Sequence, residues 1–129
     1  MPIKESNHKH SRSDTRRSVR GHIWIDGPEG VFIGWGRVNL LEQIRTQGSI
    51  TKAAKALEMA YRHAWDLVDS MNRQSKMPFV EVTAGGKGGG GARVTEEGEK
   101  AIRLFRQFAE DFKVFLEREQ KKLLLSKYR

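Results

Sequence analysis

Gly48 to Asn72 reads GSITKAAKALEMAYRHAWDLVDSMN, and this stretch decides the predicted fold. Its first part predicts a short helix with a narrow apolar stripe of Ile50, Ala53, Ala54 and Leu57. Residues 58–60 predict a tight turn. A second helix is predicted over about residues 61–74, because apolar side chains recur there at helical spacing: Tyr61, Ala64, Trp65, Val68 and Met71. Two short helices joined by a tight turn indicate a helix-turn-helix, which presents its second helix to the major groove of DNA.

A glycine-saturated loop further along the chain indicates a wing. Phe79 to Val82 and Ala92 to Thr95 are strand-like runs, and residues 85–91 between them read GGKGGGG. Glycine lets the main chain approach a phosphate closely and donate N–H bonds, while Lys87 adds a positive charge. A nucleotide-binding P-loop is the alternative. It is disfavoured because glycine follows Lys87 where Ser or Thr is required, and a strand follows where a helix is required.

The flanking elements complete a mainly α fold with small β elements. An N-terminal β-hairpin is predicted from alternation over 20–25, turn residues over 26–30 and an extended run over 31–33. Residues 37–47 predict a supporting helix that ends at Gly48. Thr95 is expected to cap a long C-terminal helix with a broad apolar band. The fold class is therefore a winged helix-turn-helix with an N-terminal hairpin and a C-terminal dimerisation helix.

Composition indicates the partners and the compartment. The net charge of +8 favours polyanions, because Lys and Arg release counterions from nucleic acid. The chain has no Cys, which fits a reducing cytoplasm, and no apolar run long enough for a membrane span. Three regions are expected: a disordered basic tail over 1–19, the DNA-binding domain with its dimerisation helix over 20–116, and a fraying basic tail over 117–129. The first tail is either a phosphate-binding arm or a solvated segment.

Candidate site residues follow from the faces of these elements. Arg62 begins the predicted recognition helix and could form a bidentate pair with guanine O6 and N7. The predicted DNA contacts are Ser49, Thr51, Lys52, Lys55, Tyr61, Arg62, His63, Arg73, Lys87 and Arg93. Ser49 or Thr51 is also expected to cap the helix that starts there. The predicted homodimer interface is Phe105, Phe108, Phe112, Phe115 and Leu116, unless this helix only packs within its own chain.

No catalytic residue, cofactor or specific metal site is expected. His8 and His10 lie in a polar tail without a third ligand, and no triad of nucleophile, base and orienting acid is visible. Two hypotheses about DNA remain open: a sequence-specific regulator associated with the nucleoid, and an architectural protein that binds DNA without reading bases. A nucleotide-binding module built on the glycine loop is the third.

Taken in order, these pieces resemble the N-terminal DNA-binding domain of the molybdate-responsive ModE-like regulators, which is similar to the winged helix-turn-helix of LysR-type regulators. The stretches that carry the resemblance are Gly36-Arg37, 40–44, 48–54, Tyr61-Arg62 with Ala64-Trp65, Met71-Asn72, 85–92, and Thr95 with Gly98. The resemblance implies a dimeric transcription factor that binds a palindromic operator through its third helix and its wing.

Two departures from the family pattern matter. The family's C-terminal oxyanion-binding domains lie beyond the matching residues, and the residues that would bind molybdate are absent from this sequence, so we expect no molybdate binding. Ala60 stands where the family commonly has Ser. A side-chain cap on the recognition helix is thereby lost, which costs about 0.5–2 kcal/mol.

Overall fold

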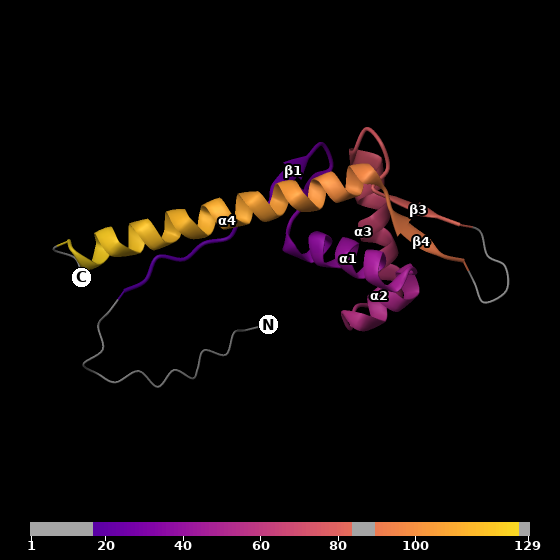
Figure 1. Ribbon diagram of the computed structural model, residues 1–129, viewed down its shortest axis with the longest axis horizontal. Helices are drawn as coiled ribbons and strands as arrows, with labels where there is room; N and C mark the ends of the chain where they lie inside the picture. The colour runs from indigo at the N-terminus through magenta and orange to yellow at the C-terminus, as the bar shows by residue number, and fades with distance from the viewer. Residues whose placement is uncertain (1–16, 84–89, 127–129) are drawn as a thin grey trace. The chain divides into compact units, whose positions relative to one another are not determined.

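A computed structural model describes residues 17–83 and 90–126 of the chain (Figure 1). Its elements, in chain order, are β1 (Ile25–Gly27), β2 (Gly30–Ile33), α1 (Trp35–Gln47), α2 (Ile50–Ala56), α3 (Tyr61–Gln74), β3 (Val80–Val82), β4 (Ala92–Val94) and α4 (Glu96–Leu124). The predicted fold class, mainly helical with two small hairpins and a long last helix, is confirmed. Two compact units are present. We call His22–Glu110 the winged unit, and the residues before His22 together with those after Glu110 the terminal unit.

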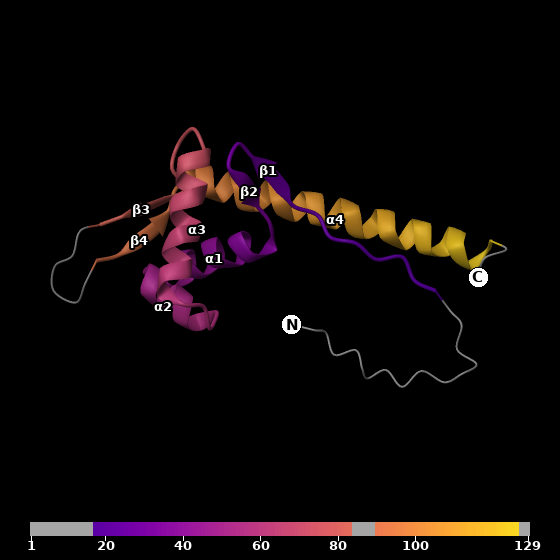
Figure 2. The ribbon, with the colours of Figure 1, turned by 180° about the vertical axis from the view of Figure 1, so that it is seen from behind.

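The core of the winged unit lies where α1, α2 and α3 meet (Figures 1 and 2). Helix α1 contributes Leu40, Leu41 and Ile44, all fully buried. Ala53 and Ala54 of α2 are also buried, and their small side chains let neighbouring helices approach closely. Strands contribute Phe79, Val80 and Ala92, and the first half of α4 contributes Ile102 and Phe105. Burial of this apolar surface is the main stabilising contribution, at about 25 cal/mol per Å².

The predicted helix ends around the motif are correct, because each depends on local chemistry. Ser49 caps α2 by accepting the Lys52 N–H bond at 3.1 Å, which decides between Ser49 and Thr51. Gly48 adopts a left-handed conformation after α1, with φ of 75°. Thr95 accepts the Gly98 N–H bond at 3.1 Å at the start of α4. No side chain caps α3 at Ala60, as the resemblance implies.

Three element boundaries differ from the prediction. Helix α1 starts at Trp35, two residues early, because extended Gly34 is its N-cap. The first hairpin turns more tightly, since Gly27 pairs directly with Gly30. Helix α4 continues to Leu124, so the expected fraying of 117–124 is wrong.

Contacts within the terminal unit explain the extra helical turns of α4. The Gln120 carboxamide accepts the Val19 N–H bond at 2.7 Å and donates to the Arg17 carbonyl at 3.0 Å. Lys122 also pairs with Glu119 at 3.0 Å, one turn away. Residues 17–19, expected to be disordered, therefore lie extended along the helix, whereas 1–16 and 127–129 are outside the described residues.

Candidate nucleic-acid interface

The start of α3 presents a polar surface on a helix whose opposite face is buried. Ala64, Val68 and Met71 point into the core. Because these positions fix the rotation of the helix, Tyr61, Arg62 and His63 are exposed at its first turn. The Arg62 side chain is 87% exposed, and its ion pair with Asp66 is long at 3.7 Å. Such an exposed pair contributes about 0–1 kcal/mol, so the Arg62 guanidinium is available to a partner.

The preceding helix adds positive charge next to that surface. Lys52 and Lys55 are exposed on α2, and so is Thr51. Ser49 is half-buried because its oxygen caps the helix. Between α2 and α3, Glu58 adopts a left-handed conformation, with φ of 54°, that closes the turn.

The wing is tied directly to the helix-turn-helix. Strands β3 and β4 pair antiparallel, with Glu81 opposite Arg93. The Ala92 N–H donates to the carbonyl of Gly48, the C-cap of α1, at 2.9 Å, which joins β4 to the segment between α1 and α2. At the base of the loop, Thr83 N–H donates to the Gly91 carbonyl at 2.9 Å. Lys87 and most of the glycine loop lie outside the described residues.

The two other predicted DNA-binding arginines, Arg73 and Arg93, form shorter ion pairs than Arg62 does. Arg73 donates to Glu29 at 2.9 and 3.1 Å and to Asp69 at 2.6 Å. The hydrogen bond with Glu29, followed by the charge of Glu29, raises the pKa of Arg73 above its ordinary value. Arg73 thus links the turn of the first hairpin to the end of α3, and we leave it out of the proposed interface. Arg93 pairs with Glu81 at 2.6 Å, but both side chains are about half-exposed or more, at 67% and 51%.

The predicted dimer residues on α4 separate into buried and exposed ones. Phe105 is fully buried and its ring meets Trp35 edge-on at 5.2 Å, so including it in a dimer surface is wrong. Sequence spacing could not show this, because the covering residue comes from α1. Phe108 is 45% exposed. In the terminal unit Phe115 is 43% exposed, while Phe112 and Leu116 are half-buried.

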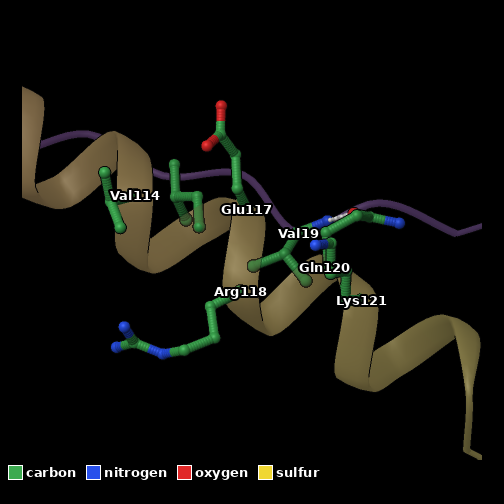
Figure 3. Close-up of a pocket in the computed structure, with 7 residues that line it drawn as sticks. Val19, Val114, Glu117, Arg118, Gln120 and Lys121 are labelled. Carbon is green, nitrogen blue, oxygen red and sulfur yellow. Dashed lines mark hydrogen bonds between the residues drawn. The ribbon is translucent and has the colours of Figure 1, made fainter.

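The terminal unit also has an apolar cleft that the sequence did not indicate. Val19 lies beside α4, and Figure 3 shows its backbone bonded to the Gln120 carboxamide. The cleft, of about 640 Å³, is lined by Val19, Val114, Leu116, Glu117, Arg118, Gln120 and Lys121. A glutamine side chain that hydrogen-bonds to backbone atoms about a hundred residues earlier has no local sequence signature, so the sequence did not predict this contact.

Within residues 17–83 and 90–126, no group of three His, Asp or Glu side chains is arranged to hold a metal ion. Among the helices of that same part, none has the length and hydropathy needed to span a membrane.

The pairing of α2 with α3, beside the β3–β4 hairpin, defines a winged helix-turn-helix protein. No protein-family model matches the chain. It is 34% identical over 99 residues to the molybdenum transport protein ModE of Azotobacter vinelandii, covering 77% of this chain and 37% of that protein. It is 46% identical over 69 residues to the transcriptional regulator ModE of Yersinia pestis, covering 54% and 26%. The DNA-binding transcriptional dual regulator ModE of Escherichia coli K12 is 42% identical over 74 residues, covering 57% and 28%.

Over the aligned residues, the chain is therefore similar in sequence to proteins named ModE. It spans between about a quarter and two fifths of the length of these relatives, whose coverage is 37%, 26% and 28%.

Proposed function

We propose that the chain is a sequence-specific, double-stranded DNA-binding transcriptional regulator that acts at the nucleoid in the cytoplasm. The observation that carries this proposal is the exposed first turn of α3, where Arg62 projects from a helix anchored by a buried opposite face. Helices presented in this way enter the major groove with their first residues against base edges. The names of two relatives, a transcriptional regulator and a DNA-binding transcriptional dual regulator, support it.

Each candidate residue has a role in this proposal. Arg62 and His63 face base edges, with Tyr61 at the boundary of this surface, and Arg62 forms the bidentate contact with guanine. The phosphate contacts are made by Ser49, Thr51, Lys52, Lys55, Lys87 and Arg93. Lys and Arg side chains at phosphates contribute affinity that falls with salt, whereas Arg62 contributes sequence preference.

We also propose that two copies associate through α4. Phe115 leaves 43% of its surface in water, and its ring stacks on Phe112 at 6.1 Å. Val114 beside them is 47% exposed and Leu125 is 86% exposed. A second copy that covers these side chains would remove apolar surface from water, and a two-fold dimer fits a palindromic operator.

Selection of bound sites from random DNA tests the function, and Arg62→Ala tests the interface. We expect Arg62→Ala to weaken binding to the selected site by about 1–3 kcal/mol and to relax the preference at one base pair. Mobility shifts with the selected and a scrambled duplex measure both effects. Arg103→Ala, which removes the same charge from exposed Arg103 on α4, is the matched control.

The possible outcomes separate the hypotheses. Unchanged affinity of Arg62→Ala for the selected site would show that α3 does not read bases through Arg62. Equal affinity of the wild-type chain for every duplex would support the architectural alternative instead. Binding of a nucleoside triphosphate in a calorimeter, lost in Lys87→Ala, would support the nucleotide-binding alternative.

A further inference from the structure

A small notch lies where α2, α3 and the base of the wing meet. It encloses about 310 Å³ and is lined by Ser49, Ile50, Thr51, Tyr61, Trp65, Val82, Thr83, Gly90, Gly91 and Ala92. Four of these residues carry a hydroxyl group and one carries an indole N–H, but none carries a carboxylate. All belong to the winged unit. The notch thus offers hydrogen-bond donors and no negative charge.

Three of the four hydroxyl groups are free to donate to a bound group. Thr51 and Tyr61 form no hydrogen bond through their hydroxyls with any residue of the described chain. Ser49 Oγ accepts the Lys52 N–H bond, so its own proton remains available. Thr83 differs, because its hydroxyl accepts from Gly91 N–H at 2.9 Å and donates to the Gly91 carbonyl at 3.2 Å. Thr83 therefore positions the base of the wing at the edge of the notch.

Trp65 adds a donor that has no acceptor. Its Nε1 atom has less than 1 Å² of exposed surface and no hydrogen-bond partner among the described residues. The indole ring packs edge-on against the Tyr61 ring, with their centroids 6.3 Å apart. Trp24 provides the contrast, because its Nε1 donates to Asp26 at 3.1 Å. A buried N–H without an acceptor destabilises the free protein, so such a group needs an explanation.

We propose that this notch binds one backbone phosphate of DNA and that Trp65 Nε1–H is one of its donors. The inference rests on the proposed function and adds Trp65 to the interface. A phosphodiester presents only acceptor oxygens, which match a site made of hydroxyl and indole donors, whereas a base edge would present donors as well. The hydroxyl groups of Ser49, Thr51 and Tyr61 bind the accessible oxygen atoms. A small movement of the residues around Trp65 then gives its N–H an acceptor that it lacks in the free protein.

Trp65→Phe tests the proposal because it removes the donor and keeps an aromatic ring. The variant loses part of the packing of the indole against the core but no satisfied hydrogen bond, so it should remain folded, with an unchanged circular dichroism spectrum and a cooperative denaturation curve. It should nevertheless bind the selected duplex about 10-fold more weakly, the effect expected for one bond to a charged group. The affinity for scrambled DNA should fall by the same factor, because phosphates are common to all sequences. Thr51→Val and Tyr61→Phe should behave similarly, and Trp24→Phe is the matched control.

Duplexes with a single methylphosphonate identify the phosphate. A methylphosphonate at any contacted phosphate should weaken the wild-type chain, but at only one position in each half-site should Trp65→Phe cause no additional loss. The indole N–H resonance of Trp65, assigned by its absence in Trp65→Phe, should move downfield when the wild-type chain binds DNA.

The controls separate two kinds of failure. A wild-type chain without affinity for any duplex would overturn the proposed function and this inference with it. A wild-type chain that binds DNA while Trp65→Phe, Thr51→Val and Tyr61→Phe bind equally well would overturn this inference alone. If Trp65→Phe bound more weakly than the wild-type chain to the duplexes modified at every position, the inference would likewise be overturned, because the indole would then act elsewhere.

Discussion

Glu58 occupies a backbone conformation that glycine adopts far more easily. Its φ of 54° closes the turn between α2 and α3, and a left-handed conformation costs an L-residue roughly 1–2 kcal/mol. We expect Glu58→Gly to raise the free energy of unfolding by about 0.5–1 kcal/mol, after the added freedom of the unfolded chain is subtracted. Urea denaturation measures the change. Ala56→Gly, within α2, is the control and should destabilise; if both variants lost stability equally, Glu58 would not be strained.

Gly98 and Gly36 make an internally matched pair of helical glycines. A Cβ atom at Gly98 would lie 2.6 Å from the Phe79 carbonyl oxygen and 2.7 Å from Val94 Cγ1, whereas at Gly36 it would meet nothing within 4 Å. Gly98→Ala should therefore lower the free energy of unfolding by about 1–3 kcal/mol. Gly36→Ala should raise it by about 0.5 kcal/mol through helix propensity. Thermal melts of both variants measure these changes. A stabilised Gly98→Ala would contradict the close approach of α4 to Phe79 and Val94.

Single-residue roles were predictable from sequence when they depended on near neighbours. Ser49, Gly48 and Thr95 terminate helices through atoms a few residues away; Gly48 and Thr95 were identified, and Ser49 was one of the two caps predicted for α2. The ion pair of Arg73 and the burial of Phe105 were not foreseen, because their partners, Glu29 and Trp35, are distant in sequence. Trp65, which belongs to the apolar face of the predicted helix, is only half-buried, and its N–H has no partner among the described residues.

At the scale of elements, Asn72 joins α3 to β3. Its Oδ1 accepts the Phe79 and Val80 N–H bonds at 2.8 and 3.2 Å, and its Nδ2 donates to the Val80 carbonyl at 3.0 Å. Asn72→Ala should cost about 2–3 kcal/mol of unfolding free energy, from three bonds of about 1 kcal/mol each. Asn72→Asp keeps the acceptor and should cost less. Equilibrium denaturation distinguishes them, and equal losses would show that the two N–H bonds contribute nothing.

Element positions were predicted better than element ends. Apolar spacing located all four helices, since each buries one face against the others. The start of α1 was missed because Trp35 is 43% exposed and adds nothing to the apolar stripe. The end of α4 was missed because the sequence after Leu116 is strongly charged, whereas in the structure Gln120 bonds a chain segment about a hundred residues earlier.

At the scale of the whole molecule, the charge of +8 and the exposed phenylalanines require different partners. Positive charge draws the chain to DNA, but it opposes the association of two identical chains, so a dimer must gain from apolar burial more than it loses by repulsion. The dimer should therefore become more stable as salt is added, while DNA binding becomes weaker. The two associations are thus separable in experiment.

Phe115→Glu tests the proposed dimer. Phe115 is 43% exposed on α4, and a carboxylate there cannot be buried against a second copy without a large desolvation cost. We expect sedimentation equilibrium to show a dimer for the wild-type chain and a monomer for Phe115→Glu at the same concentration, with helix content unchanged by circular dichroism. Lys113→Glu, which also adds a carboxylate to an exposed position of α4, should remain dimeric.

Because a monomer holds a single recognition helix, Phe115→Glu should bind an isolated half-site as the wild-type chain does but lose the advantage of the full palindrome. Full affinity for the palindrome in a monomeric variant would show that recognition of the palindrome does not depend on association through α4.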